Sequence, residues 1–253
     1  MEEEVEKAQK IMLSILVEFE RICSKYQLTY WLDYGTLLGA VRHKGFIPWD
    51  DDLDVSMPRE DYEKFLQVAT KELGTSYFLQ NKTTDKDIFI HFSKIRDINS
   101  FFVEKHEVNK KISYKQGIYI DIFPINYIDS SFINRIKYTL LKTITKIFSN
   151  RYISIDYISK PLIKRTNSYH GNEYSYMVRG AEKMSNELKI DKKYIFPLQE
   201  CIFENLSFKI PSNSTKYLKL LYGDTYMVIP PVNLRKRHSS TIYFNANKQK
   251  GTS

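Results

Sequence analysis

The sequence is poor in the residues that cross-link or interrupt a chain. Its 253 residues include only 2 cysteines, Cys23 and Cys201, and neither lies in a Cys-x-x-Cys pair. This excludes a disulfide-stapled scaffold and a cysteine-rich zinc module, so we expect both thiols to be reduced. The 9 glycines and 8 prolines are fewer than usual for this length, which excludes collagen-like and loop-dominated low-complexity chains.

Long hydrophobic runs are also missing. No stretch of about 18 apolar residues occurs, which predicts that no helix spans a membrane. The first residues, Met-Glu-Glu-Glu-Val-Glu-Lys, have neither the basic start nor the apolar stretch of a secretion signal, so we expect a cytoplasmic protein. With 42% hydrophobic and 27% charged residues, the composition is that of a globular chain with one domain or one domain with a large insertion.

Positive charge is concentrated in one stretch of the chain. The net charge is +8, and residues 131–165 alone contribute +7, because they hold eight basic residues and a single acid, Asp156. Apolar positions in Phe132–Phe148 recur at spacings of three and four, which predicts an amphipathic helix with basic residues on its opposite face. Such a helix is typical of proteins that lie on a membrane surface, and it is equally compatible with an ordinary surface helix.

The rest of the chain alternates helical and strand patterns. One apolar face predicts a long N-terminal helix, and its members are Val5, Ala8, Met12, Ile15, Phe19, Ile22 and Tyr26. We expect short helices after Gly35 and Pro58, and others near residues 178–188 and 215–222. Strands are expected at residues 29–32, 53–57, 77–79, 88–95, 101–104 and 118–123, with a ragged tail from Thr241. This order predicts an α+β (α/β-like) fold: a mixed β-sheet flanked by helices, with a basic helical insertion.

Four carboxylates fall within five positions in the segment Asp50-Asp51-Asp52-Leu53-Asp54. Side chains alternate along a strand, so Asp50, Asp52 and Asp54 are expected on one face. Like charges this close repel one another and raise a pKa unless a cation lies among them. Mg²⁺ and Mn²⁺ prefer carboxylate oxygens, so the cluster predicts a metal site, with a solvated acidic turn as the plainer alternative.

Two further features fit metal-assisted transfer of a phosphorus-containing group. Asp121 lies in the otherwise apolar strand Ile118–Phe123, where a carboxylate is costly unless it pairs with a cation. An Asp-x-Asp pair with a third strand carboxylate is typical of two-metal phosphoryl or nucleotidyl transfer, although a salt-bridged core aspartate is the alternative. Gly35 and Thr36, at a helix start, would present backbone N–H groups and a hydroxyl to a phosphate.

Several motifs together resemble the LicD family, a divergent branch of the nucleotidyltransferase (polymerase-β-like) superfamily. They are residues 30–43, residues 45–54, Lys94–Asp97, Asp121–Pro124, Tyr222–Asp224, Pro230-Pro231, Arg235 and His238. The resemblance covers the core from Tyr30 to Pro124 and the stretch from Leu221 to His238. It implies a nucleotidyltransferase-type sheet for the predicted α+β fold.

The resemblance also implies an enzyme that moves a phospho-alcohol from a CDP-alcohol donor to a cell-surface glycan. For LicD-like proteins the group is phosphocholine from CDP-choline, transferred with release of CMP to a sugar hydroxyl of teichoic acid, capsule or lipopolysaccharide. Ribitol phosphate, as for fukutin-like relatives, glycerol phosphate, and an ordinary nucleotidyltransferase reaction with a nucleoside triphosphate are the alternatives. The family pattern assigns catalysis and two Mg²⁺ or Mn²⁺ ions to Asp52, Asp54 and Asp121, with Asp50 in support. By analogy we interpret Asp121 as the general base, the alternative being a metal-bound alkoxide that needs no separate base.

Polar residues near these motifs are candidates for binding the donor phosphates. Besides Gly35 and Thr36, they are Arg42, His43, Lys94, Arg96, Arg235 and His238. Arg42 either contacts the diphosphate or pairs with a neighbouring aspartate, and His43 is either a site residue or a structural histidine. Lys94 and Arg96, which alternate on a predicted strand, are interpreted as phosphate ligands rather than solvated charges. The two C-terminal residues follow a Pro-Pro break, in a loop that closes over the site or forms a solvated basic tail.

We divide the chain into three parts. Residues 1–128 are the nucleotidyltransferase-like catalytic core with its N-terminal helix, residues 129–175 are the basic amphipathic helical insertion, and residues 176–253 are a C-terminal helical part that completes the site. The predicted partners are a CDP-alcohol, a glycan or lipid-linked glycan acceptor, and the inner face of the plasma membrane, contacted through Phe132–Phe148. Tyrosines after that helix either bind an acceptor sugar or a choline cation, or only pack: Tyr152, Tyr157, Tyr169, Tyr174 and Tyr176. No nucleic-acid partner is expected, because the basic residues share a helix with an aliphatic face instead of alternating with stacking aromatics.

Overall fold

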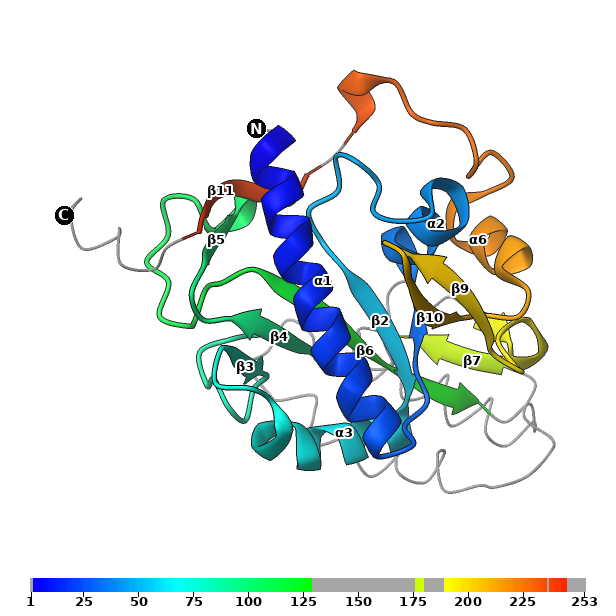
Figure 1. Ribbon diagram of the computed structural model, residues 1–253, viewed down its shortest axis with the longest axis horizontal. Helices are drawn as coiled ribbons and strands as arrows, with labels where there is room; N and C mark the ends of the chain where they lie inside the picture. Colours follow the sequence, from blue (N-terminus) through cyan, green and yellow to red (C-terminus); the bar gives the residue numbers. More distant parts are fainter. Residues whose placement is uncertain (1, 129–175, 180–188, 236, 245–253) are drawn as a thin grey trace, which may run out of the picture.

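A mixed β-sheet forms the centre of the structure, a computed structural model that describes residues 2–128, 176–179, 189–235 and 237–244. Its strand order is β1 (Trp31–Leu32), β2 (Asp54–Pro58), β6 (Tyr119–Ile128), β4 (Ser93–Asp97) and β3 (Tyr77–Gln80). β7 (Tyr176–Arg179) pairs with the last residues of β6, and β8 (Lys189–Asp191) pairs with β7. β2 and β6 are parallel, whereas the other neighbours are antiparallel, so the predicted mixed sheet is confirmed (Figure 1).

Helices and small sheets pack around this centre. Helix α1 (Glu2–Lys25) crosses the sheet and contacts β4, β6 and α3 (Arg59–Glu72), whereas α2 (Tyr34–His43) contacts β2 and α6 (Ser214–Tyr222). Two short antiparallel sheets pair β9 (Gln199–Phe203) with β10 (Leu206–Ile210) and β5 (Phe101–Glu104) with β11 (Ser239–Tyr243). Three 3-10 turns complete the list: Lys105–Glu107, Lys192–Tyr194 and Val232–Leu234. Within the described residues, no helix is long and apolar enough to cross a bilayer.

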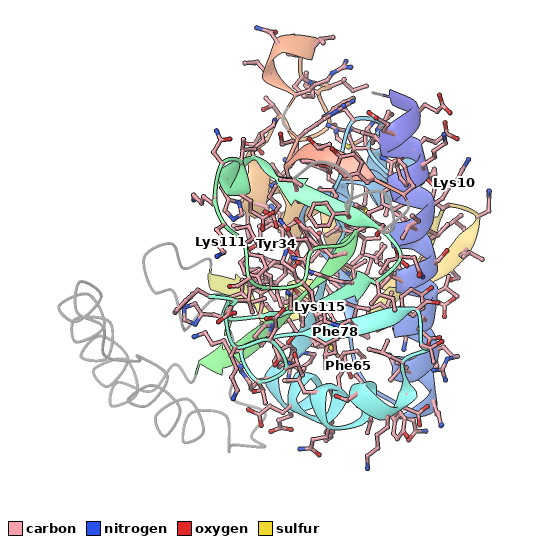
Figure 2. The ribbon with its side chains drawn as sticks, turned by 90° about the vertical axis from the view of Figure 1, so that its left-hand side faces the viewer. Lys10, Tyr34, Phe65, Phe78, Lys111 and Lys115 are labelled. Atoms are coloured by element: carbon pink, nitrogen blue, oxygen red, sulfur yellow. The ribbon has the colours of Figure 1, made fainter. Side chains whose placement is uncertain are left out.

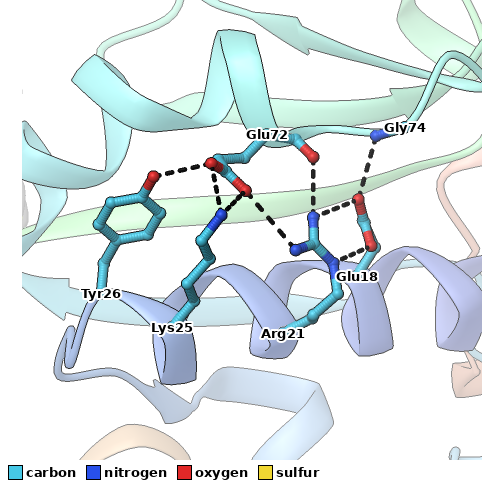
Figure 3. Close-up of polar contacts among 6 residues, drawn as sticks. All are labelled: Glu18, Arg21, Lys25, Tyr26, Glu72 and Gly74. Carbon is cyan, nitrogen blue, oxygen red and sulfur yellow. Dashed lines mark hydrogen bonds and ion pairs between the residues drawn. The ribbon is translucent and has the colours of Figure 1, made fainter.

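The predicted apolar face of α1 is confirmed except at its last member. Val5, Ala8, Met12, Ile15, Phe19 and Ile22 are buried, but Tyr26 is 39% exposed. Its hydroxyl donates to Glu72 Oε1 at 2.7 Å, in a network that ties the end of α1 to the end of α3. Figure 3 shows the network, formed by Glu18, Arg21, Lys25, Tyr26, Glu72 and Gly74. Its charged groups are largely exposed, so each pair contributes little on its own.

Short helices form where the sequence changes from apolar runs to polar punctuation. Asp33 caps α2 by accepting from the Tyr34 N–H at 2.7 Å, and Pro58 immediately precedes α3, as expected for a helix start. The helix predicted near residues 215–222 and the strand at residues 101–104 are confirmed. β3 is the last strand in the order of the central sheet. Its residue Phe78 is covered by a lysine, with Lys115 Nζ 4.3 Å from the ring centre (Figure 2).

Three predicted segments differ in the structure. The strand expected at 88–95 begins only at Ser93, and residues 88–92 instead form irregular backbone that lines a cavity. Residues 176–179, at the edge of the helix expected at 178–188, form strand β7, because β6 extends far enough to pair with them; residues 180–188 lie outside the described residues. The expected ragged tail from Thr241 is strand β11, held by pairing with β5. The hairpin of β9 and β10 was not predicted. The insertion at 129–175, with the basic helix predicted at Phe132–Phe148 and with Tyr152, Tyr157, Tyr169 and Tyr174, lies outside the described residues.

Candidate active site

Two of the predicted catalytic carboxylates lie side by side on the parallel strands at the centre of the sheet. Asp54 opens β2 and is in register with Asp121 of β6, and both are buried. Parallel neighbours in register project their side chains to the same face of the sheet. Thr36, predicted as a phosphate ligand, accepts a hydrogen bond from the Asp54 N–H at 2.8 Å through its hydroxyl. Helix α2 is thereby joined to the start of the strand that carries Asp54.

Asp50 and Asp52 precede β2 in irregular backbone, so the strand alternation that was expected to put them on one face with Asp54 does not apply to them. The pKa of Asp54 is raised well above its usual value, first by burial and then by the nearby charges of Asp52 and Asp121. Burial and the neighbouring Asp52 likewise raise the pKa of Asp50. Burial also raises the pKa values of Asp52 and Asp121. The four carboxylates therefore form a crowded acidic cluster.

Lys94 is the basic residue closest to this cluster. It lies on β4, is 5% exposed, and places its ammonium 2.8 Å from Asp121 Oδ1 and 3.8 Å from Glu104 Oε1. The same ammonium lies 3.3 Å from the ring centre of Tyr119. The Lys94 ammonium thus lies where it opposes part of the repulsion among the carboxylates.

Asp51, which the sequence analysis left out, anchors the C-terminal segment. Its carboxylate is fully buried and accepts from the backbone N–H groups of His238 at 2.7 Å and Ser239 at 2.8 Å, and from the Ser239 hydroxyl. This brings His238 Nε2 to 3.1 Å from Asp52 Oδ2. Local spacing held no signal for this role, because the segment is irregular and the partners of Asp51 are 187 and 188 residues away in sequence.

Gly35 packs so closely against the cluster that a larger residue would push on the Asp50 side chain. A Cβ at this position would lie 2.7 Å from Asp50 Oδ2, which is closer than non-bonded atoms tolerate. Since Gly35 belongs to the first turn of α2, its backbone can approach whatever the carboxylates hold.

The other predicted phosphate ligands have different partners. Arg42 Nη1 donates to the carbonyls of Tyr226 at 2.9 Å and Val228 at 3.3 Å, and its Nε donates to His43 Nδ1 at 3.3 Å. Arg235 lies over the Trp49 ring at 4.0 Å and donates to the Pro230 carbonyl at 3.2 Å. Both arginines thus hold the loop that follows α6.

Arg96 is buried in the wall of the site. It donates to the Gln80 side chain and to the Gly117 carbonyl, the latter at 2.7 Å, and lies 4.7 Å from the ring centre of Tyr119. In the structure it braces β3, β4 and the segment before β6.

A cavity of about 550 Å³ extends away from the cluster. Beside the cluster it is lined by Asp52, Asp121, Lys94 and His238, and Glu104 lies next to Lys94. The remaining lining is mostly apolar or aromatic, with acidic and basic side chains interspersed. The complete lining is Asp52, Asp87, Ile88, Phe89, Ile90, Phe92, Lys94, Arg96, Glu104, His106, Glu107, Lys110, Ile112, Tyr114, Tyr119, Asp121 and His238. Acidic groups outnumber lysines and arginines, so a bound anion needs additional positive charge from another source.

The chemistry of the carboxylate cluster fits a hard divalent cation. Asp52, Asp54 and Asp121 offer only oxygen ligands, and their pKa values are raised, first of all by burial. A hard cation among them would favour the ionised carboxylates. As placed, no three histidine, cysteine, aspartate or glutamate side chains within the described ranges are already grouped as metal ligands.

Fold and site together define a domain with a mixed sheet and flanking helices. Its candidate active site is a buried cluster of aspartates next to Gly35, in the first turn of α2. Residues 27–154 match the family model described as LicD/FKTN/FKRP, nucleotidyltransferase domain, so the chain belongs to this family and is a LicD-type phosphotransferase.

Three relatives illustrate the range of the family. The chain is 27% identical to the lipopolysaccharide cholinephosphotransferase LicD of Haemophilus influenzae, over 91% of this chain and 94% of the relative. It is 31% identical to an uncharacterized protein of Rickettsia typhi, over 54% of this chain and 50% of the relative. It is 39% identical to the human ribitol 5-phosphate transferase FKRP, over 24% of this chain and 13% of the relative.

Proposed function

We propose that this phosphotransferase moves phosphocholine from CDP-choline to a sugar hydroxyl of a cell-surface glycan, such as teichoic acid, capsule or lipopolysaccharide. The acceptor oxygen attacks the phosphorus next to choline, the bond to the bridging oxygen of the diphosphate breaks, and CMP leaves. The observation that carries the proposal is the in-register pair Asp54 and Asp121, with Asp52 beside them, at the end of a cavity that suits the donor.

Asp52, Asp54 and Asp121, with Asp50 in support, would hold one or two Mg²⁺ or Mn²⁺ ions. When bound, these ions supply positive charge for the transferring phosphoryl group. Lys94, at 2.8 Å from Asp121, is placed to bind a phosphate oxygen as well. Asp121 would accept the proton of the acceptor hydroxyl. Gly35 would allow the diphosphate to approach the first turn of α2, and His238 would close the site from the C-terminal side.

The lining of the cavity supports a cationic alcohol. It combines aromatic rings, such as Phe89 and Tyr114, with carboxylates that outnumber the lysines and arginines. Aromatic rings and carboxylates attract a quaternary ammonium, whereas a neutral polyol gains more from paired hydrogen-bond donors and acceptors. Ribitol phosphate is the second candidate, because the 64 residues shared with FKRP are 39% identical.

The protein is proposed to act at the inner face of the plasma membrane, where a lipid-linked glycan would be its acceptor. The basic segment Phe132–Phe148 supports this location through its charge pattern alone.

Donor and metal are tested together by measuring CMP release from CDP-choline, CDP-ribitol and CDP-glycerol with Mg²⁺, with Mn²⁺ or with EDTA. We expect CMP from CDP-choline above the other donors, and none with EDTA. Pyrophosphate from a nucleoside triphosphate, without CMP from any CDP-alcohol, would instead favour the ordinary nucleotidyltransferase reaction.

Variants Asp52→Asn and Asp54→Asn are expected to lower CMP release at least about a thousandfold while the protein stays folded. Because the crowded charges cost stability, Asp54→Asn should also unfold at a higher temperature than the metal-free parent and lose any stabilisation by Mg²⁺. Glu60→Gln, an exposed acid on α3, serves as the matched control. Full activity of either aspartate variant would contradict the proposal.

A further inference from the structure

The loop between α6 and β11 exposes an unusual amount of apolar surface. Five large hydrophobic side chains within eight residues are about half to three-quarters exposed: Met227 49%, Val228 67%, Ile229 53%, Val232 74% and Leu234 62%. Soluble surfaces rarely leave such a contiguous patch uncovered. Figures 1 and 2 show this segment, in orange, projecting beyond the rest of the described chain at the top of both views.

The loop is held in this exposed position by polar contacts of its backbone. Arg42 donates to the carbonyls of Tyr226 and Val228, and Arg235 donates to the carbonyl of Pro230 while its guanidinium lies over the Trp49 ring. Tight turns satisfy further groups, because the Val228 N–H donates to Thr225 O at 2.9 Å and the Leu234 N–H donates to Pro231 O at 2.9 Å. Several backbone groups of the loop are thus satisfied internally while its apolar side chains are exposed, an arrangement that favours entry into a lipid interface.

The residues next to the loop carry positive charge, which suits a negatively charged surface. No acidic residue occurs between Thr225 and Arg237, and the apolar stretch is followed directly by Arg235, Lys236 and Arg237. Aliphatic side chains on a projecting loop with adjacent basic residues suit an anionic bilayer. A protein partner would more commonly meet aromatic anchors and a flatter or grooved patch.

We infer that residues 226–235 form a docking loop that inserts its aliphatic side chains into an anionic lipid bilayer. The loop is attached through Arg42 and Arg235 to α2 and to Trp49, which immediately precedes the carboxylate cluster. Docking would therefore place that cluster at the lipid surface. This consequence for a lipid-linked acceptor rests on the proposed function, whereas bilayer binding does not.

The test is co-sedimentation of the full-length protein with vesicles of phosphatidylcholine plus phosphatidylglycerol, and with vesicles of phosphatidylcholine alone. We expect the parent to bind the anionic vesicles more tightly. The double variant Val228→Ser/Val232→Ser should bind them roughly tenfold or more weakly, because two inserted apolar side chains are lost. The matched control Ile202→Ser/Leu206→Ser changes two exposed apolar residues of the β9–β10 hairpin, 51% and 42% exposed, and should bind like the parent.

Three outcomes would overturn the inference. They are a parent that does not sediment with anionic vesicles, a loop variant that sediments as well as the parent, and equal losses in the loop and hairpin variants. A dimeric parent that becomes monomeric in the loop variant, without vesicle binding, would assign the loop to pairing of two copies instead. CMP release from CDP-choline in solution should be equal in parent and loop variant. A failure of the proposed reaction would therefore leave the vesicle result unaffected.

Discussion

Glu107 shows how single hydrogen bonds keep a buried carboxylate ionised in the cavity wall. It is 3% exposed and accepts from the Tyr114 hydroxyl at 2.5 Å, the Gln116 amide at 2.7 Å and the Glu104 N–H at 2.9 Å. Burial by itself would raise the pKa of Glu107, but the three hydrogen bonds outweigh it and lower the pKa below its usual 4.5. The ionised Glu107 carboxylate therefore holds the end of β5, where Glu104 lies.

A carboxyl group with a lowered folded-state pKa stabilises the folded chain above pH 4.5, and this contribution is lost as the pH falls through the folded-state value. We expect Glu107→Gln to lower the free energy of unfolding by about 1–3 kcal/mol at pH 7, because its neighbours lose a charged acceptor. The difference in the free energy of unfolding between parent and variant should become smaller below pH 4.5. Urea unfolding across this pH range measures both, with Glu60→Gln as the exposed control. A gap that stays constant with pH would contradict the assignment.

At the scale of one element, α2 must lie very close to the loop that leads to the carboxylates. A Cβ on Gly39 would lie 2.5 Å from the Gly45 carbonyl oxygen and 3.3 Å from the Ile47 nitrogen. Both contacts are with backbone, which cannot move aside as a flexible side chain can. Glycine in this helix therefore reflects packing against the chain that positions Asp50, although it lowers intrinsic helix stability.

Gly39→Ala is accordingly expected to cost about 1–3 kcal/mol by overpacking, in spite of the better helix propensity of alanine. For a chain of this length that corresponds to roughly 2–4 °C in Tm per kcal/mol. Gly74→Ala is the matched control, because its added Cβ would meet nothing closer than 3.8 Å. Thermal unfolding of both variants, followed by circular dichroism, checks the contrast; a Gly39→Ala variant as stable as Gly74→Ala would show that the loop yields.

At the scale of the whole molecule, the buried carboxylate of Asp51 joins the loop before β2 to the C-terminal segment. Asp51 accepts backbone N–H groups of His238 and Ser239, which follow it by 187 and 188 residues, and β11 then pairs with β5. The backbone N–H of Lys105, next to β5, also donates to the His238 carbonyl at 2.9 Å. The site therefore includes groups from both ends of the sequence.

Asp51→Ala should lower the free energy of unfolding by about 2–4 kcal/mol, because two amides lose their acceptor. CMP release should fall as well, since His238 loses the contacts that hold it beside Asp52. Asp224→Ala is the control: its carboxylate is 86% exposed, and its ion pair with Lys219 is screened by solvent and should contribute little to stability. Calorimetry and CMP release on both variants decide the matter. Parent-like stability of Asp51→Ala would remove the proposed anchoring role.

Local patterns predicted those elements whose periodicity is strong or whose boundaries carry their own signals. The apolar face of α1, the helix at Ser214–Tyr222 and the strand at Phe101–Glu104 are of this kind. Strands β7 and β11 were missed because each is stabilised by a partner distant in sequence, β6 and β5. Tyr26 left the predicted apolar face because Glu72, on another helix, offers its hydroxyl a partner.

The sequence by itself determined the family, the mixed helix and strand architecture, and the residue types of the carboxylate cluster, because these depend on motifs and short-range patterns. Only the tertiary structure decided which side chains meet. It placed Asp54 in register with Asp121, turned Asp51 toward His238 and Ser239, and directed Arg42 and Arg235 to loop carbonyls. Such pairings depend on strand register and on chain segments that meet after more than a hundred intervening residues, and local sequence carries no record of either.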